Sequence, residues 1–145
     1  MAKIKTPVTL KVKDFKDREV ASLTYTLNQA IDRDGQVADV PRGGLIVLRM
    51  KALNDGNTEL FNWMVDQELA KDGVIEFMNS TDTAKKMKDI QFYDAYCVNF
   101  SEHWEDDLSG GYLAHWEEIT ISCRKITIEK VSYVNDWTMR RDEEK

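Results

Sequence analysis

The segment LAHWEEITISCRKITI, residues 113–128, alternates apolar and polar side chains with the period of two that is typical of a β-strand. Three residues on one face of this strand are Ile119, Ile121 and Cys123. The apolar set then changes parity at Ile126, which predicts a bulge or bend near residues 124–125. The segment therefore predicts one long, bent strand.

Six further stretches predict strands, most of them by the same alternation and the third, which is apolar on both faces near its start, as a central strand. They are residues 8–12, 21–27, 44–50, 74–78, 87–93 and 96–101. In the second of them the apolar face carries Ala21, Leu23, Tyr25 and Leu27. A chain of seven strands and little else predicts a mainly β fold, namely a closed or nearly closed β-barrel.

Residues 58–71 depart from the period of two. Their apolar side chains recur at three- and four-residue spacing, as on one face of a helix: Leu60, Phe61, Met64, Val65 and Leu69. Asn57 can cap the start of such a helix, and Lys71 with Gly73 supplies a stop signal at its end. We expect one α-helix, about Thr58–Lys71, on the outside of the barrel.

The composition excludes several classes of protein. At 145 residues the chain is expected to form a single domain, with its core at about residues 8–128 and a charged tail at 138–145. Twenty Lys and Arg against 26 Asp and Glu give a net charge of −6, which argues against binding to nucleic acid. The longest aliphatic run, Leu45-Ile46-Val47-Leu48, is too short for membrane insertion, and the basic start lacks the apolar segment of a signal peptide.

The residues that carry most enzyme chemistry are few in this chain. His103 and His115 are the two histidines, and no spacing with a serine or cysteine indicates a catalytic triad. A metal site built from them with Cys97 and Cys123 would draw its ligands singly from separate segments, so we expect no metal, no cofactor and two buried free thiols. Acidic residues at 105–107 and 117–118 are interpreted as solvent-facing rather than catalytic. The chain is not expected to be an enzyme.

Polar connections and unplaced aromatic residues favour self-assembly instead. Residues 31–43 must project, because the chain re-enters the barrel only at Gly44. The charges of this connection have mixed sign, which suits pairing with another subunit: Asp32, Arg33, Asp34, Asp39 and Arg42. Bulky rings also lie in or beside polar segments, where an interface is their usual setting: Trp104, Tyr112 and Trp137.

Five short motifs, in this order around one predicted helix, resemble the type VI secretion tube proteins of the Hcp (TssD) family, in particular the branch of Bacteroidetes-type systems. The motifs are Tyr25-x-Leu27-x-Gln29, Pro41-Arg42-Gly43-Gly44, Leu60-Phe61-x-Trp63-Met64-Val65-Asp66, Gly73-x-Ile75-x-Phe77 and Ala95-Tyr96-Cys97-Val98. The resemblance covers about residues 8–128. The stretch 102–118 and the tail after Trp137 lie outside the matching pattern.

The resemblance implies an antiparallel β-barrel of two packed sheets with one flanking helix. It also implies a non-enzymatic subunit of hexameric rings, which stack into the inner tube of a contractile injection apparatus. The implied partners are other copies of the chain, the contractile sheath, the spike and baseplate proteins, and secreted effectors in the lumen. Such a subunit assembles in the cytoplasm and is exported by the apparatus itself. The projecting connection at 31–43 would contact neighbouring subunits within and between rings.

Two other classes of function remain open from the residues alone. A monomeric β-barrel with a small apolar ligand inside is the main alternative, although a barrel of this size is more often filled by its own side chains. A small barrel enzyme, such as a flavin reductase, would need phosphate- or flavin-binding loops, and none is found in the sequence.

Overall fold

The computed structural model describes residues 7–53, 55–78, 86–107, 112–135 and 137, which form seven strands and one short helix. The elements in chain order are β1 (Val8–Val12), β2 (Arg18–Tyr25), β3 (Leu45–Lys51), α1 (Glu59–Val65), β4 (Lys71–Met78), β5 (Lys86–Asp107), β6 (Tyr112–Ile128) and β7 (Val131–Val134). The predicted charged tail at 138–145 lies outside the described residues.

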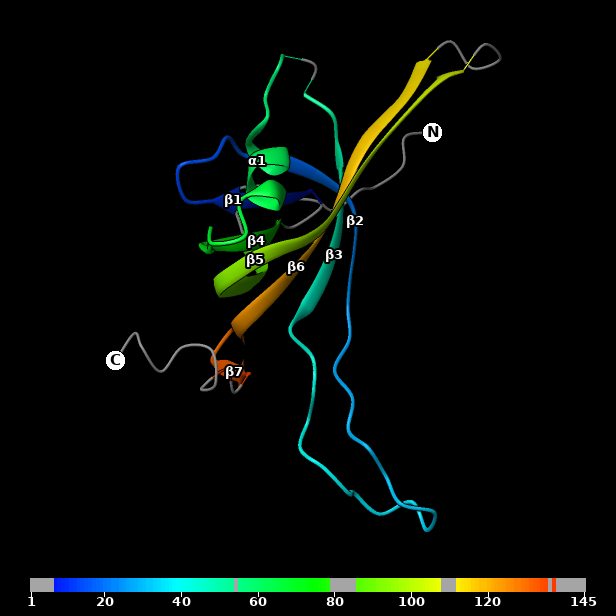
Figure 1. Cartoon of the computed structure of the whole chain (residues 1–145), viewed down its shortest axis with the longest axis vertical. Coiled ribbons are helices and arrows are strands. Elements are labelled where there is room, and N and C mark those ends of the chain that lie inside the picture. The colour runs from blue at the N-terminus through cyan, green and yellow to red at the C-terminus, as the bar shows by residue number, and fades with distance from the viewer. Residues whose placement is uncertain (1–6, 54, 79–85, 108–111, 136, 138–145) are drawn as a thin grey trace.

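All neighbouring strands pair antiparallel, in the order β3-β2-β1-β4-β5-β6-β7. An additional pairing of β3 with β6, from Leu45 opposite Ser122 to Lys51 opposite Trp116, closes six strands into a barrel. β7 extends the sheet beyond the closure by pairing with β6 alone. The closed antiparallel barrel with one flanking helix confirms the predicted fold class (Figure 1).

The barrel is filled by its own side chains. Large side chains from β3, β4, β5 and β6 that are completely removed from solvent fill its interior: Ile46, Leu48, Met50, Ile75, Ile90, Phe92, Ile119 and Ile121. Burying an apolar side chain of this size contributes about 1.5–3 kcal/mol relative to leaving it exposed. The interior thus holds the fold together and serves as its packed core.

The predicted helix is too long and its buried face is rotated. α1 ends at Val65, and the chain from Lys71 onward already belongs to β4. Leu60 and Trp63 are the buried residues of the helix, whereas Phe61 and Val65 are more than half exposed. The reason is tertiary: Trp63 enters the core and its Nε1–H donates a hydrogen bond to the Ala95 carbonyl at 3.1 Å.

Asn57 helps to cap the start of α1 as the sequence predicts, although the N-cap position itself is one residue later. Thr58 is the N-cap, and its side chain makes no capping hydrogen bond. Asn57 supplies the missing acceptor, because its Oδ1 receives the Glu59 backbone N–H at 3.0 Å. Glu59 lies in the first turn, where its negative charge suits the positive end of the helix.

The largest error in the predicted strands concerns β5. The two short strands expected at 87–93 and 96–101 are one strand that runs on to Asp107 and pairs with β6 along its whole length. Asp94 interrupts the alternation from within, with a φ of 51°, so Phe92 and Ala95 are both buried. Residues 124–125, where the sequence predicts a change of parity, lie opposite Asp94. The register of β5 and β6 is the same on both sides of this position and shifts instead between Cys97 and Asn99.

β2 differs from its predicted pattern for a similar reason. The strand begins at Arg18, and a register shift between Val20 and Ser22 exchanges its two faces. Val20 is therefore buried while Ala21, expected on the inner face, is exposed. β7 has no counterpart among the predicted strands, because its four residues are too few for alternation to stand out.

Cys97 and Cys123 are both free and buried, as predicted. Burial raises the pKa of the Cys97 thiol to about 11 and that of Cys123 to about 12. Since the thiolate is the reactive form, we expect a maleimide to label the native protein at least about a hundredfold more slowly than the urea-unfolded protein at pH 8. Mass spectrometry of timed samples measures both rates; fast labelling of the native chain would contradict burial.

We further expect Cys123→Ser to cost about 1–3 kcal/mol of stability.

Candidate assembly interface

Two projections leave the barrel at opposite ends of the molecule (Figure 1). The first, called the loop arm, comprises residues 26–43 between β2 and β3. The second, called the hairpin arm, comprises residues 101–107 of β5 and 112–117 of β6, which pair with each other beyond the body of the barrel. A subunit with a projection at each end can offer different surfaces to two neighbours.

The loop arm is a ladder rather than a structureless connection. The backbones of Asn28 and Arg42 exchange two hydrogen bonds of 2.9 and 2.7 Å, and Ile31 pairs with Val37 further out. Ala38 N–H donates to the Ala30 carbonyl at 2.8 Å between these two bridges. These bonds give the arm a defined shape although its side chains are solvent-exposed.

The five charged residues predicted for an interface all lie on the loop arm, in two separate groups. Asp32 shapes the tip, where its Oδ1 accepts the backbone N–H groups of Asp34 and Gln36 at 2.9 and 3.0 Å. Near the base, the Arg42 guanidinium contacts Asp39 Oδ2 through Nε at 3.0 Å and through a terminal nitrogen at 2.9 Å. Within the described residues, the Arg33 side chain makes no hydrogen bond or ion pair.

The contacts near the base also favour the ionised form of the Asp39 carboxylate. The Val40 backbone N–H, followed by the Arg42 side chain, lowers the pKa of Asp39 below its usual value. Asp39 is therefore fully ionised at neutral pH and remains paired with Arg42. This leaves Arg33 as the positive charge on the arm that is available to a partner.

Exposed apolar side chains accompany these charges, a feature that the prediction did not use. Leu27, Ile31, Val37 and Val40 all lie on the loop arm, and Ile31 is 64% exposed. Four large apolar groups on one thin projection are costly to leave in water. Their presence favours an arm that is covered by another protein surface in the assembled state.

The base of the loop arm is held by residues that the sequence reasoning missed. Asn135 Nδ2 donates to the Gly43 carbonyl at 3.1 Å and to the Cys123 carbonyl at 2.9 Å, and the Tyr133 hydroxyl accepts the Gly43 N–H at 2.9 Å. Gly44 has a φ of +100°, and a Cβ there would lie 2.9 Å from the Cys123 carbonyl oxygen. The direction of the arm is thus set by tertiary contacts as well as by Pro41 and the two glycines.

The hairpin arm carries the histidines and an exposed indole. Trp104 is 57% exposed, so its ring is open to the interface that the sequence predicts for it. His103 stacks on Trp116 with ring centroids 4.3 Å apart, and the Arg49 guanidinium lies 4.6 Å from the Trp116 ring. Trp137 instead packs against Tyr96 and is half-buried. The side chain of Tyr112 lies outside the described residues.

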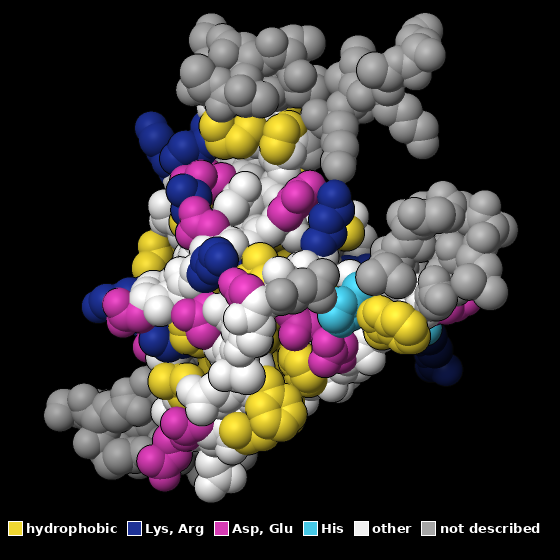
Figure 2. Space-filling model, turned by 90° about the horizontal axis from the view of Figure 1, so that it is seen from above, with side chains coloured by type: hydrophobic (Ala, Val, Ile, Leu, Met, Phe, Trp, Pro, Cys, Tyr) yellow, Lys and Arg dark blue, Asp and Glu magenta, His cyan; other side chains and the backbone are white. Residues whose placement is uncertain are grey.

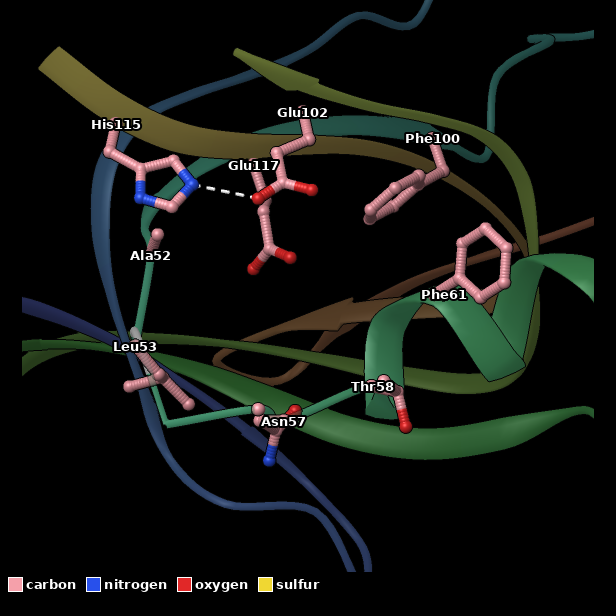
Figure 3. Close-up of a pocket in the computed structure, with 10 residues that line it drawn as sticks. Ala52, Leu53, Asn57, Thr58, Phe61, Phe100, Glu102, His115 and Glu117 are labelled. Atoms are coloured by element: carbon pink, nitrogen blue, oxygen red, sulfur yellow. Dashed lines mark hydrogen bonds and ion pairs between the residues drawn. The ribbon is translucent and has the colours of Figure 1, made fainter. Parts of the chain in front are cut away.

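A surface cavity of about 430 Å³ lies at the root of the hairpin arm, where the 52–58 segment and α1 meet β5 and β6 (Figure 3). Phe61 and Phe100 form an apolar wall, with their rings edge-to-face at 5.7 Å between centroids. Glu102 and Glu117 lie across from them, with His115 beside Glu102. The cavity thus combines two aromatic rings with two carboxylates.

Each carboxylate of the cavity has one partner in the described part of the chain. His115 Nε2 lies 2.7 Å from Glu102 Oε2, and the buried Arg18 guanidinium contacts Glu117 Oε1 at 2.5 Å. Arg18 is only 3% exposed and also donates to the Lys51 carbonyl at 2.9 Å. These contacts hold both carboxylates in place while leaving one oxygen of each without a hydrogen bond among the described residues.

The catalytic and metal-binding candidates are not brought together. His103 and His115 lie on the hairpin arm, whereas Cys97 and Cys123 are buried within the barrel. Among the described residues, no group of three or more His, Cys, Asp or Glu could hold a metal ion. In the same part of the chain, no helix has the length and apolar character needed to span a membrane.

One family of known proteins matches most of the chain. Residues 4–138 match the family described as hemolysin coregulated protein Hcp (TssD). Hcp1 from Flavobacterium johnsoniae is 31% identical, with 89% of this chain and 99% of that chain covered and a TM-score of 0.78. No curated protein matches the sequence.

More distant structures share the fold. The crystal structure of an Hcp protein has 14% identity and a TM-score of 0.73, and the match covers 92% of this chain and 98% of that chain. A chain of the sheath-tube complex of the extracellular contractile injection system PVC has 20% identity and a TM-score of 0.56. That match covers 86% of this chain and 88% of the other.

Proposed function

Because this chain belongs to the Hcp (TssD) family and is a subunit of the inner tube of a type VI secretion apparatus, we propose that it forms hexameric rings that stack through the loop arm. The match to the family over residues 4–138 is the observation that carries this proposal. We assign subunit–subunit contacts to Asp32, Arg33, Asp34, Asp39 and Arg42. Their exposure, together with the exposed apolar residues of the same arm, supports the assignment.

The alternative of a monomeric ligand-binding barrel is not favoured. Side chains of the chain itself fill the barrel, including Ile46, Phe92 and Ile121 at 0% exposure. The cavity described above lies at the surface, between the 52–58 segment and the hairpin arm, rather than inside the barrel. The family is one of structural proteins, and we propose a role without catalysis for this chain.

The wider assembly follows from the same proposal. The chain forms one tube domain, and its stacked rings run inside a contractile sheath, grow from a baseplate under a spike, and carry effectors in the lumen. The subunit assembles in the cytoplasm and leaves the cell when the sheath contracts. Likeness in fold to a chain of a sheath-tube complex supports a tube surrounded by a sheath.

Ring formation is the first test of the proposal. Six subunits at −6 each amount to −36, so like-charge repulsion opposes closure of a hexamer. Salt at physiological strength screens beyond about 8 Å, which leaves apolar and backbone contacts to hold the ring. We expect native mass spectrometry and sedimentation to show a hexamer at micromolar concentration that persists as salt is raised. A monomer under all salt conditions would contradict the ring.

A further inference from the structure

We propose that the cavity at the root of the hairpin arm is the receptor for the tip of the loop arm of a second copy of this chain, with Arg33 entering between Glu102 and Glu117. The inference rests on the proposed stacking and names the surface that receives the arm. It is drawn from the chemistry of the two surfaces and from their positions at opposite ends of the molecule.

The positions of the two surfaces require contact with a different subunit. The loop arm extends from one end of the barrel, while α1 and the hairpin arm lie toward the other end (Figure 1). The residues that line the cavity come from α1, the 52–58 segment and the root of the hairpin arm. A projection and a hole at opposite ends make a head-to-tail contact, which either closes a ring or continues along an axis, depending on the rotation between neighbours. We place this contact along the stacking axis, between one ring and the next.

The cavity has the chemistry of a guanidinium site. Glu102 and Glu117 lie on one side, and each keeps one oxygen without a hydrogen bond among the described residues. Phe61 and Phe100 provide aromatic faces on the other side, where a cation is stabilised by the ring electrons. Arginine suits both walls, because its planar group donates several hydrogen bonds to carboxylates and stacks on rings.

The space-filling view looks onto the end of the molecule that carries the hairpin arm. Acidic side chains lie beside hydrophobic ones and next to a histidine (Figure 2). Phe61 is 54% exposed within one subunit, so its ring is available to a neighbour. An insertion from another chain would cover this ring and exclude water from the carboxylates, which strengthens their attraction for a cation.

The loop arm presents a matching group. Arg33 follows Asp32 at the tip, and the turn is held by the two backbone hydrogen bonds to Asp32 Oδ1. Arg33 has no partner in the described residues, in contrast to Arg42, which is held by Asp39. The neighbouring Ile31 and Val37 are 64% and 58% exposed and would follow the arginine toward the apolar wall.

Charge exchange tests the pairing. We expect Arg33→Glu and Glu102→Arg each to shorten tubes seen by electron microscopy at least about tenfold while hexamers remain, and the double variant to restore tube length. Arg33→Lys keeps the charge but loses the planar donors, so its tubes should be of intermediate length. Glu105→Arg is the matched control, because Glu105 is on the same strand but does not line the cavity. Unchanged tubes in both single variants would overturn the pairing.

Cross-linking tests contact directly. A flexible bismaleimide added to assembled Arg33→Cys/Glu102→Cys protein should produce a ladder of linked chains that continues beyond six, because the contact runs between rings. Cys97 and Cys123 are buried and should not react. The Arg33→Cys/Glu105→Cys protein is the control. A ladder that stops at six, or none in protein that still forms tubes, would overturn this inference and leave the tube intact; absence of rings in the unmodified chain would instead refute the proposed function.

Discussion

Replacing residues 31–42 by a short Gly-Ser turn is expected to abolish tube formation while the barrel remains folded. The replaced residues are all exposed, and none of them belongs to the buried core. Closing a shorter flexible loop costs slightly less entropy, and the removal of exposed apolar groups such as Ile31 and Val40 loses no apolar burial within the subunit. The arm therefore contributes to assembly far more than to stability.

The measurement combines thermal melting, ring size and secretion of the same variant. The melting temperature of the barrel should change by only a few degrees, as expected for a stability change near 1 kcal/mol. A second variant, with an equally long arm of Gly, Ser and Thr, separates the side chains from mere length and should also fail to form tubes. Normal tubes from the shortened variant would refute the role of the arm, and normal tubes from the equally long variant would refute the role of its side chains. Loss of folding would show that the arm belongs to the core.

The largest loss of stability is expected for Trp63→Ala. The Trp63 side chain is completely buried, packs edge-to-face on Phe15 at 5.7 Å between centroids, and donates a hydrogen bond to the Ala95 carbonyl. Truncation leaves a cavity and an unpaired buried carbonyl, which together should cost about 3–5 kcal/mol. Domains of this kind are stable by about 5–15 kcal/mol, so the variant loses a large part of its stability.

Urea denaturation followed by circular dichroism gives the change in the free energy of unfolding. Trp63→Phe keeps most of the packing and loses only the hydrogen bond, so its cost should be smaller, about 1–3 kcal/mol. Trp104→Ala is the matched control, since that indole is 57% exposed and its removal should change stability by no more than about 0.5 kcal/mol. Equal losses for Trp63→Ala and Trp104→Ala would show that α1 is not anchored through its tryptophan.

The sequence predicts the exposed loop arm well and its internal structure poorly. Polar residues between two apolar strands indicate a projection, and the placement of Asp39 three residues before Arg42 is compatible with the pair that forms. The ladder from Asn28–Arg42 to Ile31–Val37 depends on two segments meeting in space, for which no local pattern exists. The hydrogen bonds that hold Gly43 at the base of the arm come from Tyr133 and Asn135, about ninety positions further along the chain.

The sequence by itself determined the barrel, because alternation along a strand is a local property that is imposed by one buried face. It also indicated the burial of Cys97 and Cys123, because both lie within predicted strands. The end of α1 at Val65, the exchange of faces at Val20 and the continuity of β5 were decided only by tertiary structure. In each case a long-range contact outweighs a local preference of a few tenths of a kcal/mol per residue. The cavity between α1 and the hairpin arm has the same origin, since Phe61, Glu102 and Glu117 meet only when the barrel closes.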